Sequence, residues 1–196
     1  MNRFASSPAY LNGLPSTSQT TVYVTGDNGT NQVGVPHRYE VLTTGQYSGT
    51  TAITLNGKTD THANACVADH QFKIMFSRTP SASVGISSNG TLPFTTNGNG
   101  EGAFAYAAAA NSASLAGFTN WRLPTDAELV AMRNMEAPTG SPDASEFPAI
   151  TGNYWSSTTR PDTTANAMVI LISAGLPTSV VKTTESAYRV WLVRSV

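Results

Sequence analysis

The side chains best suited to chemistry in this 196-residue sequence are His62, Cys66 and His70, which follow one another at intervals of four residues. On an α-helix this spacing would bring two imidazoles and a thiolate to one face, a geometry that zinc accepts. A structural zinc site needs a fourth ligand, however, and Asn64 favours a loop between them. We therefore expect a small buried Cys66 and two surface histidines, with a metal site as the alternative.

The sequence lacks the motifs that would indicate other kinds of catalysis. It contains no Gly-x-Ser-x-Gly, and no histidine stands in a motif that would activate a serine. A glycine-rich loop of the kind that cradles phosphate is also missing. Cys66 is the single cysteine, so no internal disulfide can form. We expect a protein without enzymatic activity and without a cofactor.

The composition favours a structural or binding protein over a cytosolic enzyme. Charged residues make up 12% of the chain, about half the usual share, and Thr, Ser, Asn and Gly take their place. The net charge is −1 and the basic residues are scattered, so we expect no binding of nucleic acid. No apolar run approaches the roughly 18 residues that span a membrane, and the first residues lack the apolar core of a secretory signal. Such a chain would reach the outside within a virus particle released by lysis.

The chain divides into a short N-terminal arm and one domain. Residues 1–20 are rich in Pro, Ser and Thr and carry isolated apolar anchors, which are Phe4, Tyr10, Leu11 and Leu14. An arm of this kind would lie across a neighbouring subunit; a loose tail is the alternative. Residues 21–196 can bury one core and are expected to form a single domain.

Short β-type runs alternate with turns on either side of a helical segment. Strands are expected at residues 22–24, 39–42, 50–55, 72–76, 154–157, 167–172 and 189–193. Asn56-Gly57 is a strong signal for a two-residue hairpin turn. Val190 to Val193 are apolar at consecutive positions, which indicates that both faces of the sheet are covered there.

The first expected helix covers residues 101–115, which include four consecutive alanines. Phe104, Ala107, Ala108 and Leu115 fall on one face at helical spacing, and Gly117 stands where a C-terminal cap belongs.

The second helix begins at Thr125, whose side chain can cap the N-terminus while Glu128 completes a capping box. Leu129 and Met132 face inward, and the helix is expected to end near Glu136. The predicted fold class is therefore α+β: two helices packed on a twisted, mainly antiparallel sheet.

Several motifs occur together in the order found in one known family. They are Trp121-Arg122-Leu123-Pro124-Thr125 with Glu128 and Leu129, then Tyr154-Trp155-Ser156-Ser157-Thr158-Thr159, and a closing Val193-Arg194. With the alanine-rich helix before them, these motifs resemble the Lcl C-terminal domain family, a domain of unknown function that occurs in bacterial surface proteins and phage genomes. The resemblance covers roughly residues 20–196, and Leu92 to Gly102 resembles phage-encoded members.

The resemblance implies a C-type-lectin-like fold, which serves binding rather than one chemistry. Sugar-binding lectins of this fold use calcium with a Glu-Pro-Asn or Gln-Pro-Asp loop and a Trp-Asn-Asp strand, and both are missing here. Formylglycine-generating enzymes share the broader fold, but the lone Cys66 cannot supply a site like their two-cysteine copper centre. We expect Trp121 and Trp155 to be core anchors and Arg122 to be a hydrogen-bond hub, with a ligand contact as its alternative.

These features predict a non-enzymatic phage virion surface protein, either a decoration of the capsid or tail or a fibre component. Its partners would be other virion proteins or copies of itself, on the surface of the particle and without membrane insertion. The alternative is an adhesin module, outside the cell, that binds a host glycan or receptor. Its binding loops would be residues 158–164 and 173–179, although neither contains an aromatic platform for a sugar.

Deletion of residues 1–15 tests the predicted arm. We expect the truncated protein to lose attachment to the particle while its melting temperature stays unchanged, because the arm contributes to assembly and not to the core. Co-sedimentation with particles and a thermal melt measure the two effects. Normal incorporation of the truncated protein would contradict the arm hypothesis.

Overall fold

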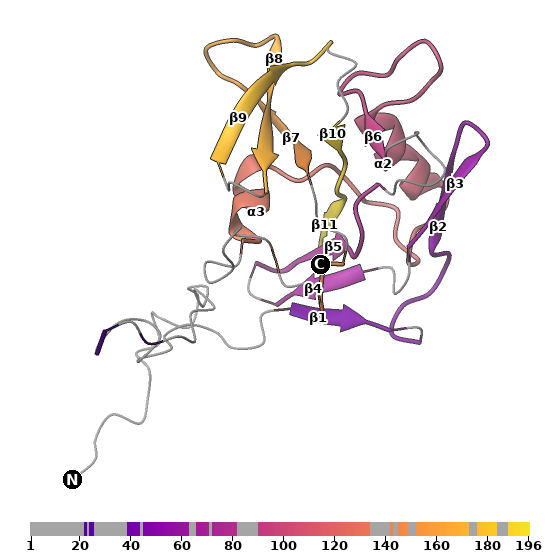
Figure 1. Ribbon diagram of the computed structural model, residues 1–196. Helices are drawn as coiled ribbons and strands as arrows, with labels where there is room; N and C mark the ends of the chain where they lie inside the picture. Colours follow the sequence, from indigo (N-terminus) through magenta and orange to yellow (C-terminus); the bar gives the residue numbers. More distant parts are fainter. Residues whose placement is uncertain are drawn as a thin grey trace.

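The computed structural model describes residues 22, 24–25, 39–43, 45–62, 66–70, 72–81, 90–133, 142, 145–148, 152–172, 176–183 and 188–196. These residues confirm an α+β fold with two helices and mainly antiparallel sheets (Figure 1). Neither described helix is long and apolar enough to cross a membrane. The predicted arm at residues 1–20, with Phe4, Tyr10, Leu11 and Leu14, lies outside the described residues. Val22 and Val24 are described and exposed, but they belong to no strand.

A four-stranded antiparallel sheet forms one half of the domain, in the order β1-β4-β5-β11. Its strands are β1 Tyr39–Leu42, β4 Cys66–Asp69, β5 Ile74–Ser77 and β11 Val193–Ser195. The two central strands, β4 and β5, are buried at every position. The strand predicted at residues 72–76 begins later, because Phe72 and Lys73 form the turn from β4 to β5, with Lys73 at φ 56°.

A five-stranded sheet forms the other half, in the order β6-β10-β7-β8-β9. Its strands are β6 Thr91–Leu92, β7 Asn153–Thr159, β8 Asn166–Leu171, β9 Leu176–Val181 and β10 Tyr188–Arg189. β10 and β7 are parallel, and the other neighbours are antiparallel. The described strands therefore form two main sheets where the sequence predicted one.

The predicted hairpin is present as β2 Ala52–Leu55 and β3 Lys58–Thr61. Its turn residues Asn56 and Gly57 have φ angles of 53° and 72°, which is the left-handed conformation that an Asn-Gly hairpin turn requires. The hairpin packs against the first helix, and Ile53 of β2 is fully buried in the core there.

That helix, α2, covers Ala103–Ser112, and the face predicted for it is right only for Ala107 and Leu115, which are buried. Its buried residues are Ala103, Tyr106, Ala107 and Ala110. Phe104 is 48% exposed and Ala108 is also exposed. Alanines occur all round the helix, so the pattern alone does not define a face. Gly117 does not cap the helix, whose C-cap is Ala113.

The second helix, α3, covers Asp126–Ala131 and lies against β7, β8 and β9. Its capping box is confirmed: the Thr125 side chain accepts from the Glu128 amide while the Glu128 side chain accepts from the Thr125 amide. The helix is shorter than predicted, because Met132 is its C-cap and turns its side chain into the core.

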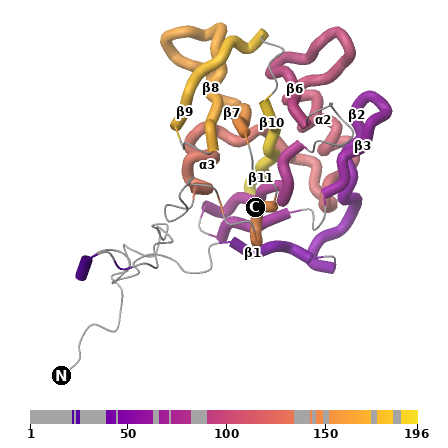
Figure 2. Tube along the Cα trace, in the orientation of Figure 1, coloured from indigo at the N-terminus to yellow at the C-terminus, as the bar shows by residue number. Residues whose placement is uncertain are grey.

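The C-terminal segment passes from one sheet to the other (Figure 2). The strand predicted at residues 189–193 is divided, since β10 ends at Arg189 and β11 begins at Val193. Val190 to Val193 are all fully buried, which confirms that both of their sides are covered. Val190 and Leu192 pack in the core beneath α2, whereas Trp191 and Val193 pack with Phe76, Phe147 and Tyr154 in a second core.

Glycine is required where the loop after β1 meets the loop after α2. Gly49 has φ +85°, and a Cβ there would come within 2.5 Å of the Gly117 backbone nitrogen. Gly57 also has a positive φ, +72°, but a Cβ there would meet nothing within 4 Å. The two positions therefore separate the effect of backbone conformation from that of close approach.

We expect Gly49→Ala to lower the free energy of unfolding by about 3 kcal/mol or more, because a methyl group would collide with backbone that cannot move aside. Gly57→Ala is the matched control and should cost about 1–2 kcal/mol, the strain of a left-handed alanine. Urea unfolding of both variants measures the difference. Equal losses would show that the two loops separate at little cost.

Candidate functional site

The two motif tryptophans are core anchors, as predicted. Trp121 is buried, and its indole Nε1 donates to the Leu115 carbonyl at 2.9 Å. Trp155 is fully buried, and its Nε1 donates to the Leu92 carbonyl at 2.8 Å. Tyr154, its neighbour on β7, packs against Trp191 in the other core. Because alternate strand residues point to opposite faces, β7 anchors both cores at once.

Arg122 and Glu128 form a bidentate ion pair that also caps α3. The guanidinium donates to the two carboxylate oxygens at 2.8 and 2.7 Å, and its Nη1 also donates to the Leu123 carbonyl at 3.1 Å. The same carboxylate accepts from the Thr125 amide at 2.8 Å. Arg122 is therefore a hydrogen-bond hub as predicted, with a half-buried side chain that is 43% exposed.

Electrostatics favour the charged form of both partners in this pair. Partial burial raises the pKa of Glu128, but its hydrogen bonds from Arg122 and Thr125 outweigh that effect and hold the pKa below its ordinary value. The hydrogen bond to Glu128 raises the pKa of Arg122. The pair therefore persists at neutral pH and orients the start of α3.

The Tyr-Trp-Ser-Ser-Thr-Thr strand clamps this helix to the sheet. Thr158 donates to the Asp126 carboxylate at 2.7 Å and accepts from the Asp126 amide at 3.2 Å. The Ser157 amide donates to the Pro124 carbonyl at 2.7 Å. The family motifs thus hold α3 on β7, and these side chains have little capacity left for a ligand.

A shallow groove of about 590 Å³ lies where the β7–β8 loop meets β9. It is lined by Arg160, Pro161, Asp162, Met168, Pro177, Thr178 and Ser179. Arg160 donates to both oxygens of Asp162, at 2.5 and 2.8 Å, and to the Ser179 hydroxyl at 2.9 Å. The described parts of the two loops predicted to bind a partner therefore meet in one groove. Its walls carry hydroxyls, a guanidinium and a carboxylate, and none of the described residues that line it is aromatic.

His62 is fully buried, so the prediction of a surface histidine is wrong there. Its Nε2 lies 3.0 Å from the Tyr106 hydroxyl, which donates to the Asp60 carboxylate at 3.2 Å. Its Nδ1 lies 2.7 Å from the Thr79 hydroxyl. Because the Tyr106 proton goes to Asp60, Nε2 must donate to Tyr106, and Nδ1 accepts from Thr79. This assigns a neutral imidazole to the network.

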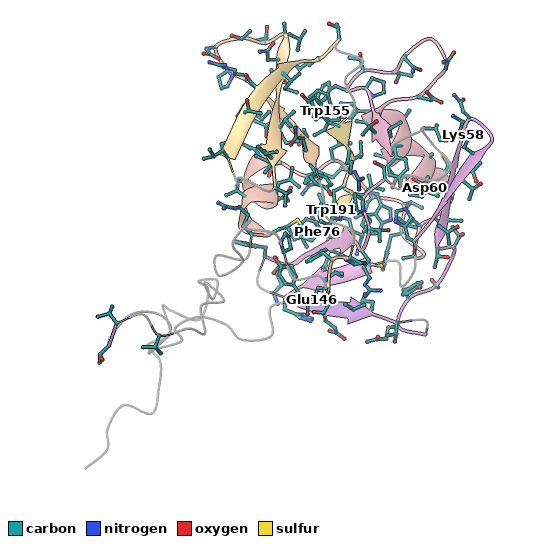
Figure 3. All side chains as sticks on the ribbon, viewed as in Figure 1. Lys58, Asp60, Phe76, Glu146, Trp155 and Trp191 are labelled. Atoms are coloured by element: carbon teal, nitrogen blue, oxygen red, sulfur yellow. The ribbon has the colours of Figure 1, made fainter. Side chains whose placement is uncertain are left out.

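The sequence did not lead us to predict the buried network of Asp60, His62 and Tyr106, although one signal could have indicated it. Tyr106 is the one polar aromatic side chain of the alanine-rich helix, and a buried tyrosine hydroxyl needs a partner. Asp60 and His62 supply that partner from β3 and the residue after it. Figure 3 shows Asp60 at the hairpin, beside α2.

The other two candidate metal ligands point to different surroundings. Cys66 is fully buried on β4, and burial raises the pKa of its thiol to about 12. His70 is half-exposed and lies 2.8 Å from the Glu40 carboxylate. The described part of the segment is extended rather than helical, and four residues of extended chain span about 13 Å, so Cys66 and His70 lie too far apart to share one ion. Among the described residues, no three His, Cys, Asp or Glu side chains are grouped to hold a metal ion.

The comparisons agree with the motifs. The model of the Lcl C-terminal domain matches residues 65–194, so the chain belongs to that family. This confirms the resemblance inferred from the Trp-Arg-Leu-Pro-Thr and Tyr-Trp-Ser-Ser-Thr-Thr segments. A comparison with curated proteins gave no match.

The buried imidazole predicts a loss of stability in acid. Burial lowers the pKa of His62 from 6.5 to about 4, although a hydrogen bond to the Thr79 backbone, which favours the charged imidazole, opposes the shift. The unfolded chain binds this proton more readily, so the loss begins as the pH falls below 6.5 and is complete near pH 4. The difference in pKa corresponds to about 3 kcal/mol.

Urea unfolding between pH 7 and pH 4 measures this loss in the wild-type protein and in His62→Gln. Glutamine offers a donor and an acceptor but takes up no proton, so its profile should be flatter by about that amount. Parallel profiles for the two proteins would show that other groups cause the loss in acid.

Proposed function

We propose that this chain is a non-enzymatic surface protein of a bacteriophage virion, built on a C-type-lectin-like module. The observation that carries the proposal is the use of the family motifs within the fold. Trp121 and Trp155 fill the core, and the Arg122–Glu128 pair orients α3. The residues of the family motifs thus stabilise the fold, and the protein would act by presenting a stable surface on the particle.

The arrangement of the sheets supports the C-type-lectin-like module that the family implies. The first and last described strands, β1 and β11, belong to the same four-stranded sheet. The segment between them forms the hairpin, both helices and the five-stranded sheet (Figure 1). A long segment that leaves one sheet and returns to it can vary in sequence while the core stays fixed, and such a segment can present a binding surface.

The composition of the surface supports the proposed location on a virion. Charged residues are 12% of the chain, and the exposed residues of the β7–β8 loop and β9 are mainly Thr, Pro and Ala beside the paired Arg160 and Asp162. Such a surface is polar but carries little net field, so many copies can stand side by side on one particle without repulsion. The protein would either decorate the capsid or tail or form part of a fibre.

Immunogold labelling of purified phage particles tests the proposal. Antibodies against the recombinant domain should label intact particles at regular positions, and quantitative mass spectrometry should find several copies per particle. The control is the same antibody after it has been pre-absorbed with the recombinant domain, which should abolish the labelling. Detection of the chain only in the soluble fraction of the lysate would contradict the proposal.

A second candidate function is an adhesin module, favoured by the groove between the β7–β8 loop and β9. Its hydroxyls and the Arg160–Asp162 pair could hydrogen-bond a host glycan. Arg160→Ala should then lower micromolar binding on a glycan array and adsorption to host cells by about tenfold. Lys58→Ala, which removes one positive charge at the hairpin, should leave both unchanged. No binding on the glycan array, together with a full set of copies on the particle, would favour the function of a decoration protein.

A further inference from the structure

The strand β9 is the last strand of the five-stranded sheet formed by the described residues. Its six residues pair with β8 along their whole length, and no other described strand pairs with its outer side. An edge of this kind presents a row of backbone N–H and C=O groups to the surroundings. Figure 1 shows β9 at the margin of the sheet, with β8 on one side.

The register identifies the backbone groups that point outward. The Lys182 amide donates to the Ala165 carbonyl at 2.9 Å, which continues the β8–β9 register by one step. In an antiparallel pair, hydrogen-bonded and non-hydrogen-bonded positions alternate. Pro177, Ser179 and Val181 therefore turn their backbone groups outward. Pro177 has no N–H, so Ser179 and Val181 are the residues that offer both a donor and an acceptor.

The side chains of β9 leave this edge open to another strand. Edge strands are commonly protected by charges or by proline; none of the residues Leu176–Val181 is charged, and Pro177 removes a donor only from the first half of the strand. Leu176 is 66% exposed and Val181 is 44% exposed. By contrast, the outer side of β11 is occupied by Arg122, whose amide and carbonyl bond with Val193 at 2.9 and 2.8 Å. Among the described edges, β9 is the long one that lacks both charge and cover.

We propose that β9 pairs antiparallel with β9 of a second copy of this chain, about a two-fold axis at Val180. In this register Ser179 faces Val181 of the partner, so both complete donor–acceptor residues of each copy are satisfied. An axis at Ser179 would instead place the Val181 carbonyl opposite Pro177, which has no N–H to donate.

A second copy fits this edge better than an unrelated strand. The net charge of −1 gives little repulsion between copies. The pairing is isologous, so it closes on itself and leaves neither β9 edge free to recruit further chains. The two five-stranded sheets would become one continuous sheet. This inference names a partner for the proposed virion protein and in that sense rests on the proposed function.

Sedimentation velocity over a concentration series tests the pairing. The wild-type protein should sediment as a dimer at tens of micromolar, and Val181→Lys should weaken dimerisation by about tenfold or more, because it buries a charge at the junction. Thr119→Lys adds the same charge on an exposed loop away from β9 and is the matched control. Far-ultraviolet circular dichroism shows whether each variant is folded. A wild-type protein that stays monomeric at about 1 mM would overturn the proposal.

Disulfide cross-linking tests the register. Across the proposed axis the two Val180 residues form a non-hydrogen-bonded pair, whose Cα atoms lie about 4.5 Å apart and within reach of a disulfide. Val180→Cys should therefore give covalent dimers on oxidation, while Thr178→Cys, on the same face of the strand, should not. The native Cys66 is buried and stays out of the reaction. Cross-linking of both variants to the same extent, or of Thr178→Cys alone, would overturn the register.

These experiments need no particle, so the two proposals fail separately. A dimer in solution without labelling of particles would leave the pairing intact and contradict the virion function. Labelled particles built from a protein that is monomeric in solution and does not cross-link through Val180→Cys would contradict the pairing alone.

Discussion

The fold depends on how the buried C-terminal segment satisfies its backbone while it crosses between two sheets. Val190 and Leu192 lie between β10 and β11, outside both strands, yet their buried amides need hydrogen-bond partners. Ser77 and Ser81 provide it: their hydroxyls accept from the Leu192 and Val190 amides at 3.2 and 3.0 Å. Their own amides donate back to the Leu192 and Val190 carbonyls at 2.9 and 2.7 Å. The Trp191 indole adds a bond to the Ser77 carbonyl at 2.5 Å, so this short segment fixes both sheets.

The family motifs extend the same set of bonds. Val193 begins β11 and exchanges both backbone bonds with Arg122. The Arg122 side chain then holds Glu128, which caps α3, and α3 is fastened to β7 through Asp126 and Thr158. Each link joins segments that are distant in sequence. This explains why a motif of polar residues can define a family without forming a catalytic site.

The consequence for function is that the polar groups of the groove and the outward backbone groups of β9 lie together at one end of the five-stranded sheet. Ser179 belongs to two surfaces there, since its hydroxyl bonds Arg160 in the groove while its backbone faces outward from β9. Pairing of two copies along β9 would place two grooves near one two-fold axis. A ligand bound in the grooves would then meet both copies, and paired weak sites bind more tightly than single ones.

The sequence by itself determined the local structures whose partners lie within a few residues. Asn56-Gly57 specifies its turn through backbone conformation, and Thr125 with Glu128 specifies a helix start, because these bonds close within one turn. The two motif tryptophans were recognisable as core by size alone. Tertiary structure decided the rest. Only the approach of the hairpin to α2 buries His62 beside Tyr106, and only the crossing of the C-terminal segment divides one apolar run between two sheets, because these contacts join residues far apart in the chain.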